Sequence, residues 1–175
     1  MRVIGGEFRG RVLHSVPGLD TRPTPDRMRE ALFNILAPRI EGVTFADLYA
    51  GTGAVGIEAL SRGARHALFV EINHAAVGVI RRNLKTLAAE ARADVRQGKA
   101  STLAAKLDAD IVFLDPPYGL EREYTVVLGL LGEHAPQLVI VQHDVHTKLA
   151  ESYGSLVHTR LLRQGDNCLS FFEAQ

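Results

Sequence analysis

Strand-like and helix-like segments alternate along this chain from residue 43 onward, and this alternation restricts the fold more than any other feature. Short apolar runs predict strands, and longer segments with helical periodicity predict helices between them. Strands are predicted at 43–50, 66–71, 93–97, 109–115, 137–143, 156–162 and 168–173, and helices at 54–62, 74–89, 100–107, 122–134 and 146–152. Such alternation implies right-handed crossovers and a mostly parallel seven-stranded sheet of the α/β class. The last two strands are joined by Gly165-Asp166-Asn167 without a helix, so we expect an antiparallel hairpin there.

The composition is that of an ordinary globular protein and argues against several other classes. The 175 residues, of which 46% are hydrophobic and 23% charged, are enough for one well-buried core. No apolar stretch is long enough to span a bilayer, and the first residues lack the apolar core of a signal peptide. The single Cys168 cannot form an internal disulfide, which fits a reducing cytoplasm. His143 and His146 form the only close histidine pair, and no further ligands complete it, so we expect no metal site.

The first 18 residues differ from the rest, and we expect them to form a small β-hairpin extension ahead of the main domain at 19–175. Val3-Ile4 and Val12-Leu13 are extended apolar pieces separated by glycines. A ribbon this short has little core of its own, so it is expected to be mobile unless it docks to the domain or to a partner. Residues 1–40 also contain seven arginines against four acidic residues. Arginine is the cation whose planar fork suits phosphate and stacks on bases.

A helix is predicted to follow the hairpin. In Thr24-Pro25-Asp26 the threonine is placed to act as N-cap and the proline to occupy the first helical position. Met28, Leu32 and Leu36 fall on one face, which is expected to pack on the domain before Pro38 ends the helix.

A candidate nucleoside-binding crevice lies where the first two strands of the alternation end. Asp47 is in the strand that runs into loop 51–56, where Gly51 and Gly53 permit a tight turn and close approach of a ligand to the backbone. Glu71 ends the next strand, 20 residues after Gly51, a spacing at which a carboxylate binds ribose hydroxyls. Loop 51–56 also matches the dinucleotide pattern G-x-G-x-x-G. We favour S-adenosylmethionine over a nicotinamide cofactor, because the acid at 47 suits positive amino and sulfonium groups better than a pyrophosphate.

The tetrapeptide Asp115-Pro116-Pro117-Tyr118 directly follows another apolar strand and predicts methylation of a planar, conjugated amine. The lone pair of such a nitrogen is delocalised. The Asp115 carboxylate and the Pro116 carbonyl can accept both of its N–H hydrogens and favour a pyramidal nitrogen. Two successive prolines stiffen the loop, and the Tyr118 ring offers a face for stacking a base. A parallel sheet that ends in an antiparallel hairpin is typical of the Rossmann-like fold of S-adenosylmethionine-dependent methyltransferases.

These residues belong to a wider resemblance that covers most of the chain. The matching segments are Ile4-Gly5-Gly6, Arg9-Gly10-Arg11 with Leu13, the run 22–34, the run 47–64, Phe69-Val70-Glu71 and Asp115-Pro116-Pro117-Tyr118. The chain resembles the bacterial methyltransferases that act on a guanine N2 amine of 16S ribosomal RNA, the RsmD family. Run 22–34 is the most specific of these segments, whereas the glycine loop and D-P-P-Y are shared with many amino-methyltransferases.

The resemblance implies roles for three sets of residues. Asp47, Tyr49, Gly51, Gly53, Glu71, Ile72, Lys99 and Ala100 would hold S-adenosylmethionine. Asp115, Pro116, Pro117 and Tyr118 would hold the guanine edge and form the catalytic loop. Arg2, Arg9, Arg11, Arg22, Arg27 and Arg29 would contact RNA. The implied partner is 16S ribosomal RNA within the small subunit or its assembly intermediate, and the protein is expected to be a cytoplasmic monomer.

The chain departs from the family pattern at two positions. Lys99 stands where the family usually has an acid that receives the adenine amine, and a lysine side chain cannot accept a hydrogen bond. Either the backbone near residues 99–100 accepts the hydrogen bond from the adenine amine instead, or the cofactor binds more weakly. A glutamate expected near Gln142 is also missing.

Three other functions stay open from the residues alone. D-P-P-Y fits an adenine-N6 methyltransferase acting on DNA equally well. Lys99 is the one hint of a non-catalytic RNA-binding assembly factor with a decayed cofactor site. A nicotinamide-dependent oxidoreductase is the most distant alternative, because such an enzyme has no evident use for D-P-P-Y.

Overall fold

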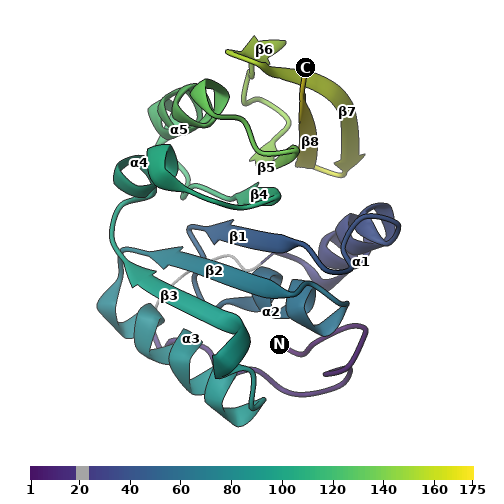
Figure 1. Ribbon diagram of the computed structural model, residues 1–175, viewed down its shortest axis with the longest axis vertical. Coiled ribbons are helices and arrows are strands. Elements are labelled where there is room, and N and C mark those ends of the chain that lie inside the picture. The colour runs from purple at the N-terminus through teal and green to yellow at the C-terminus, as the bar shows by residue number, and fades with distance from the viewer. Residues whose placement is uncertain (19–23) are drawn as a thin grey trace.

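The computed structural model of the protein describes residues 1–18 and 24–175, which form an open α/β sheet with helices on both faces (Figure 1). The helices are α1 (Asp26–Leu36), α2 (Ala54–Ser61), α3 (His74–Thr86), α4 (Ala100–Leu103) and α5 (Glu121–Glu133), with the 3-10 turns η1 (Glu90–Arg92) and η2 (Ala104–Lys106). The strands are β1 (Thr44–Leu48), β2 (His66–Glu71), β3 (Ala93–Gln97), β4 (Ile111–Leu114), β5 (Leu138–Asp144), β6 (Ser152–Tyr153), β7 (Leu156–Gln164) and β8 (Asn167–Ala174).

The strand order β3-β2-β1-β4-β5-β8-β7-β6 places β1 beside β4. The first five strands pair in parallel, which confirms the predicted α/β class and mostly parallel sheet. From β1 the chain moves outward to β2 and β3, and then returns to build β4 and β5 on the other side of β1. The direction of winding therefore reverses between β1 and β4. In open α/β sheets, ligands bind beyond the carboxyl ends of the strands at such a reversal.

The C-terminal part of the sheet contains the predicted hairpin and one strand more than predicted. β8 runs antiparallel to both β5 and β7, which confirms the hairpin around residues 165–167. The short β6 makes the sheet eight-stranded, and the helix predicted at 146–152 is wrong. The Asp144 carboxylate accepts hydrogen bonds from the backbone N–H groups of His146 and Thr147 at 2.7 and 3.0 Å. Such a side-chain turn competes with helix formation.

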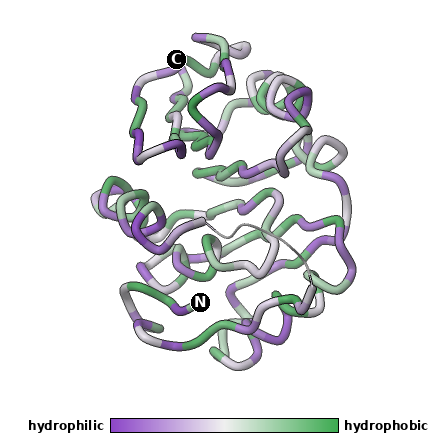
Figure 2. The backbone as a smooth tube through the Cα atoms, turned by 180° about the vertical axis from the view of Figure 1, so that it is seen from behind, coloured by the Kyte–Doolittle hydropathy of each residue, from purple (hydrophilic) through white to green (hydrophobic). Residues whose placement is uncertain are grey.

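Side chains of the central strands alternate between two faces, and each face has its own helices. On one face Phe45 and Phe113 pack in a cluster with α1 and α2, and Phe69 packs with α2, α3 and the N-terminal segment. On the other face Leu48 and Leu114 pack with α4 and α5. Figure 2 shows hydrophobic segments along the strands between these layers. Within the described ranges, no helix combines the length and the apolarity needed to cross a membrane.

Helix α1 begins differently from the prediction. It starts at Asp26, with Pro25 in the N-cap position and no side chain capping its first turn. The Thr24 hydroxyl, which was predicted to be the cap, donates a 3.0 Å hydrogen bond to Oε1 of Gln142 in β5. The predicted cap is wrong because this hydroxyl ties the start of α1 to the sheet. The predicted apolar face of α1 is confirmed, since it packs in the core beside β1, β4 and β5.

The N-terminal segment, residues 1–13, is docked to the domain. Its predicted hairpin is reduced to a single bridge between Arg2 and Val12. Val3, Phe8 and Leu13 are buried in the cluster that α2 and α3 form with β2. Of the two alternatives left open, a mobile ribbon and a docked one, the structure shows the segment docked, so removing it would expose core surface.

A buried ion pair holds the same segment in place. The Glu58 carboxylate, in α2, accepts hydrogen bonds from the backbone N–H groups of Ile4 and Gly5 at 2.9 and 2.8 Å. Its Oε2 lies 3.6 Å from Nε of Arg29 in α1, and neither side chain is exposed. Arg29 also donates a 2.6 Å hydrogen bond to the carbonyl of Arg2. Glu58 also pairs with Arg62 at 2.8 Å, and Arg29 pairs with Asp26 at 3.0 Å. Because a buried charge costs several kcal/mol when unpaired, the fully buried Glu58 carboxylate depends on the two arginines beside it.

Candidate active site

Four polar side chains, those of Asp47, Glu71, Asp115 and Gln142, leave the carboxyl end of the sheet on the same face. Each stands two positions after an apolar residue that packs on the α1–α3 face, namely Phe45, Phe69, Phe113 and Ile140. Because side chains two positions apart on a strand point the same way, all four face that side. Asp47 lies in β1 and Asp115 directly follows β4, the two strands that flank the reversal of winding, so the structure brings these predicted site residues together where the crevice was expected.

The loop after β1 contains three residues with positive φ. Gly51 and Gly53 have φ values of 58° and 81°, which glycine adopts without strain. Tyr49 has a φ of 63°, a backbone conformation that is costly for a bulky residue and that clusters at functional sites. A side chain at Gly56 would place its Cβ 2.3 Å from the Phe69 ring, so this glycine permits α2 to pack closely against β2. Because Gly51 and Gly53 have no side chains, the loop presents bare backbone at the end of β1.

The Glu71 carboxylate is held beside this loop. It accepts hydrogen bonds from the backbone N–H groups of Gly51 and Asn73, each at 2.8 Å. The side chain that follows, Ile72, is 58% exposed and presents an apolar surface next to the carboxylate. The acid predicted to bind ribose and an apolar surface suited to a ring therefore lie at adjacent positions. Their roles in holding a cofactor stay predictions.

The end of β3 borders the same area. Gln97 pairs with Glu71 in the neighbouring strand, and the N–H of Gly98 donates a 3.0 Å hydrogen bond to the Glu71 carbonyl. Lys99 is exposed at the N-cap position of α4, and Ala100, the first residue of that helix, is buried. The lysine side chain offers only donors, so an acceptor for an amine at this edge must come from the backbone or a neighbouring side chain.

Burial raises the pKa of both central aspartates. Asp47 is 2% exposed, and its Oδ2 accepts a 2.9 Å hydrogen bond from the N–H of Gly56. Desolvation raises its pKa to about 8, against the effect of that hydrogen bond and with help from the negative charges of Asp115 and Glu71. Desolvation likewise raises the pKa of Asp115 to about 7. A cation bound between these carboxylates would favour their ionised forms, so the site suits a positively charged ligand.

The catalytic-loop candidates follow β4 without a helix of their own. Asp115 is half-buried, Pro116 is buried, and Pro117 is exposed. The Pro117 carbonyl accepts a 3.3 Å hydrogen bond from the N–H of Leu120, which folds the loop back before α5. The Tyr118 side chain is 65% exposed at the tip. The loop thus combines a desolvated acid with an accessible aromatic ring.

Two contacts from α5 support the site from the other face of the sheet, and no sequence motif indicated them. The Tyr49 hydroxyl donates a 2.5 Å hydrogen bond to Oε2 of Glu123, and the Tyr124 hydroxyl donates one of 3.2 Å to the carbonyl of Gln142. Burial, first of all, raises the pKa of both tyrosines, and Glu123 adds to the rise at Tyr49. The strained Tyr49 is therefore held by α5.

Asn83, in α3, has a structural role that joins two segments of the chain. Its side chain is buried, and its Nδ2 donates hydrogen bonds of 3.1 Å to the carbonyls of Thr52 and His14. Its Oδ1 accepts a 2.8 Å hydrogen bond from the N–H of His14. One amide therefore links the glycine loop to the N-terminal segment. Only the three-dimensional packing of α3 identifies this link, because Asn83 matches no motif.

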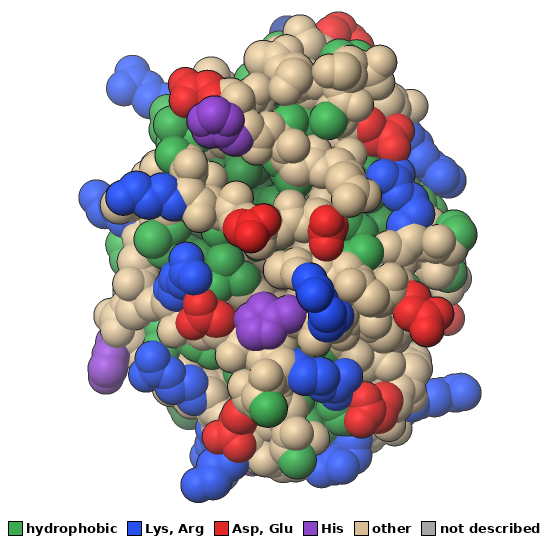
Figure 3. Space-filling model, in the orientation of Figure 1, with side chains coloured by type: hydrophobic (Ala, Val, Ile, Leu, Met, Phe, Trp, Pro, Cys, Tyr) green, Lys and Arg blue, Asp and Glu red, His purple; other side chains and the backbone are tan. Residues whose placement is uncertain are grey.

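The arginines predicted to contact RNA differ in their exposure to solvent. Arg2, Arg9, Arg11 and Arg27 are exposed. Arg29 is fully buried against Glu58, so the prediction that it contacts RNA is wrong. Arg22 lies outside the described residues. On the face shown in Figure 3, basic and acidic side chains are interspersed and do not form one continuous basic patch.

The raised pKa of Asp115 predicts a dependence of stability on pH. Its ordinary pKa of 3.8 applies to the unfolded chain, and the folded value is about 7, so the folded protein holds this proton more tightly. The contribution of Asp115 to the free energy of unfolding therefore falls as pH rises from about 4 to about 7. We expect Asp115→Asn to lose less stability than the wild type between pH 5 and pH 8 in urea titrations. If the free energy of unfolding fell equally with pH in both proteins, the raised pKa of Asp115 would be contradicted. Asp108→Asn, at an exposed position, serves as the control.

Comparisons with known proteins place the chain in a family. The family described as "Conserved hypothetical protein 95" matches residues 1–173. Ribosomal RNA small subunit methyltransferase D of Escherichia coli (strain K12) is 41% identical over 155 residues, which cover 85% of this chain and 77% of that protein. YlbH of Bacillus subtilis (strain 168), provisionally named an rRNA methyltransferase, is 40% identical over 169 residues, or 91% of each protein.

Solved structures agree with these matches. The Escherichia coli protein yhhF, provisionally named a methyltransferase, has a TM-score of 0.86 at 35% identity and covers 100% of this chain and 98% of that one. An RNA methyltransferase from Salinibacter ruber, solved with S-adenosyl-L-homocysteine, has a TM-score of 0.71 at 19% identity, covers 87% of this chain and 93% of that one, and shares the fold. The predicted S-adenosylmethionine-dependent methyltransferase fold is therefore confirmed. The chain belongs to the Conserved hypothetical protein 95 family, the RsmD family, whose relatives include ribosomal RNA small subunit methyltransferase D.

Proposed function

We propose that this protein transfers a methyl group from S-adenosylmethionine to the exocyclic N2 amine of a guanine in 16S ribosomal RNA of the small subunit. Membership of a family that includes ribosomal RNA small subunit methyltransferase D supports the reaction class. The observation that carries the proposal is the position of Asp115. This desolvated carboxylate opens a proline-stiffened loop at the reversal of winding, beside the two acids of the glycine-loop crevice.

The donor side of the crevice has groups that match the parts of S-adenosylmethionine. Glu71 would accept hydrogen bonds from the ribose hydroxyls, and Ile72 would pack against the adenine ring. Gly51 and Gly53 would allow the cofactor to approach the backbone, and buried Asp47 would face its positive charge. At the adenine edge, Lys99 supplies no acceptor, so in this proposal the backbone at Lys99 and Ala100 makes that contact.

The chain's own contribution to the reaction is orientation and charge placement. S-adenosylmethionine supplies an electrophilic methyl group. In its ionised form, the Asp115 carboxylate accepts one N–H of the guanine amine, and the Pro116 carbonyl accepts the other. These bonds localise the nitrogen lone pair. Tyr118 stacks on the base, which must leave its helix to reach the loop. With a pKa of about 7, Asp115 is also suited to take the proton that the amine loses.

The RNA side of the proposal rests on the exposed arginines. Arg2, Arg9 and Arg11, in the extension 1–18, and Arg27, at the start of α1, would contact phosphates of the small-subunit RNA, and residues 19–175 would carry the catalytic site. The protein would act as a monomer in the cytoplasm.

A transfer assay with product identification tests the function. Small subunits from cells that lack the family's methyltransferase are incubated with the purified protein and methyl-labelled S-adenosylmethionine. The RNA is then digested to nucleosides. We expect labelled N2-methylguanosine. Label in N6-methyladenosine would favour the adenine alternative, and no label above a protein-free control would favour a non-catalytic assembly factor.

A further inference from the structure

A hollow on the surface is lined by none of the proposed catalytic residues. It has a volume of about 500 Å³ and lies between the start of α1 and the β7–β8 turn. Its lining residues are Pro25, Arg27, Met28, Arg163, Gln164, Gly165 and Asn167. This volume falls within the range of roughly 300–1,000 Å³ that is usual for sites of small organic ligands. Neither the sequence motifs nor the proposed catalytic residues involve its β7–β8 wall.

The sheet places this hollow at the same edge as the catalytic loop. Asn167 pairs with Asp144 at the carboxyl end of β5, and β5 is the direct neighbour of β4, which Asp115 follows. On the α1 side, Thr24 bonds to Gln142 of β5, and the next residue, Pro25, lines the hollow. Two strand spacings, roughly 10 Å, separate β4 from β8. The hollow is therefore within reach of a nucleotide beside one that occupies the catalytic loop.

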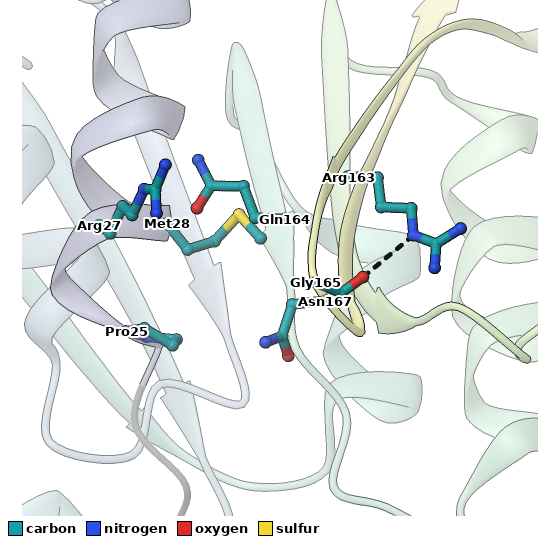
Figure 4. A pocket seen from close by; sticks show the side chains of 7 residues that line it. All are labelled: Pro25, Arg27, Met28, Arg163, Gln164, Gly165 and Asn167. Carbon is teal, nitrogen blue, oxygen red and sulfur yellow. Dashed lines mark hydrogen bonds between the residues drawn. The ribbon is translucent and has the colours of Figure 1, made fainter.

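The side chains in the hollow have the chemistry of base recognition. Figure 4 shows that Gln164 extends toward Arg27 and that Asn167 extends from the turn on the side of Pro25. Neither amide makes a side-chain hydrogen bond to any residue that the structure describes. Each therefore has both donors and an acceptor available for a base edge. Pro25 adds exposed apolar surface, and Arg27 adds a cation suited to phosphate.

Arg163 belongs to the lining but takes no part in this recognition. Its side chain points away from Arg27, on the far side of the turn (Figure 4), and its Nε donates a 3.0 Å hydrogen bond to the Gly165 carbonyl. It supports the turn that presents Gln164 and Asn167.

We propose that this hollow binds an unstacked nucleotide that flanks the target guanine, with Gln164 and Asn167 reading its base. The inference rests on the proposed function, because it takes the occupant to be part of the RNA strand whose guanine enters the catalytic loop. Flipping a base out of its helix disrupts stacking with its neighbours, and a second site for a neighbouring nucleotide holds the opened strand in register. Base-edge contacts by paired amides provide sequence preference as well as affinity.

A double-mutant cycle between protein and RNA tests this site. The protein partner is the double variant Gln164→Ala/Asn167→Ala, and the RNA partner is a reconstituted small subunit with an abasic nucleotide immediately 5′ or 3′ of the methylated guanine. Either change alone, the double variant or the abasic nucleotide, removes the hydrogen bonds to the base. Each is expected to weaken particle binding roughly tenfold. In the combination that removes both partners, the second change should have no further effect, because both remove the same contact.

The control variant is Gln137→Ala. Gln137 is an exposed glutamine just before β5, at the opposite edge of the sheet, and its amide bonds only to the Asp110 side chain among the described residues. Its removal should leave particle binding unchanged. S-adenosylmethionine affinity, measured by calorimetry, should match the wild type in all variants and so confirms that each is folded.

The proposal would be overturned if the effects of the protein variant and of the abasic nucleotide on particle affinity multiplied at both flanking positions. It would also be overturned if the double variant bound the particle with wild-type affinity. Both outcomes are read from binding rather than from methyl transfer. A wild-type protein that methylates no guanine would contradict the proposed function, while the binding cycle would still decide whether the hollow holds a flanking nucleotide.

Discussion

Asp115→Ala is expected to lower the rate of methyl transfer by at least about 100-fold, because it removes an acceptor aimed at the nitrogen that develops positive charge. Cofactor affinity should change much less, since in the proposed function Asp47 and Glu71 hold the cofactor and the Asp115 carboxylate faces the amine. The measurement is single-turnover incorporation of labelled methyl into small subunits, with calorimetry for S-adenosylmethionine binding.

Two further variants make this result specific. Asp115→Asn retains one acceptor oxygen in the same place and should keep more activity than Asp115→Ala. Asp108→Ala removes an exposed aspartate before β4, at the opposite edge of the sheet, and should behave as the wild type. Near-normal transfer by Asp115→Ala would rule out the proposed role of this carboxylate.

Glu58→Ala is expected to lower the free energy of unfolding by about 3–5 kcal/mol, the usual cost of leaving one partner of a buried ion pair alone. The change would leave Arg29 with the exposed Asp26 as its remaining partner, would unpair Arg62, and would remove the acceptor for the N–H groups of Ile4 and Gly5. The N-terminal segment should then detach more readily. Urea titration followed by circular dichroism measures the stability, and limited proteolysis near residue 13 reports the detachment.

The matched control is Glu7→Ala, in the same segment. Glu7 forms a 2.8 Å ion pair with Arg92, but its side chain is 60% exposed. Solvent screens such a pair, so its loss should cost less than about 1 kcal/mol. Equal effects of the two substitutions would show that the buried pair does not hold the segment.

The central part of the site was predictable because it depends on strand order and on the period of two. Asp47, Glu71 and Asp115 each end or follow an apolar strand, and the carboxyl ends of parallel strands share one edge. Identifying these strands was therefore enough to place the three acids together. The antiparallel hairpin was equally clear, since the short turn around residues 165–167 leaves no room for a crossover helix.

The errors arose where long-range contacts decide the outcome. Arg29 looks like its exposed neighbour Arg27, and only the approach of α2 shows that it is buried against Glu58. The 146–152 segment forms no helix because the Asp144 side chain captures two of its N–H groups. The contacts that dock residues 1–13 and those that Asn83 makes were not wrongly predicted, but they depend on tertiary packing that no local pattern encodes.

The most direct test of the proposed function is mass mapping of 16S ribosomal RNA from cells with and without this protein. RNA from the wild-type cells should contain one N2-methylguanine that is absent from the deletion strain. The wild-type gene should restore this modification, and the Asp115→Ala gene should not. An identical pattern of methylated guanines in the two strains would contradict the proposal.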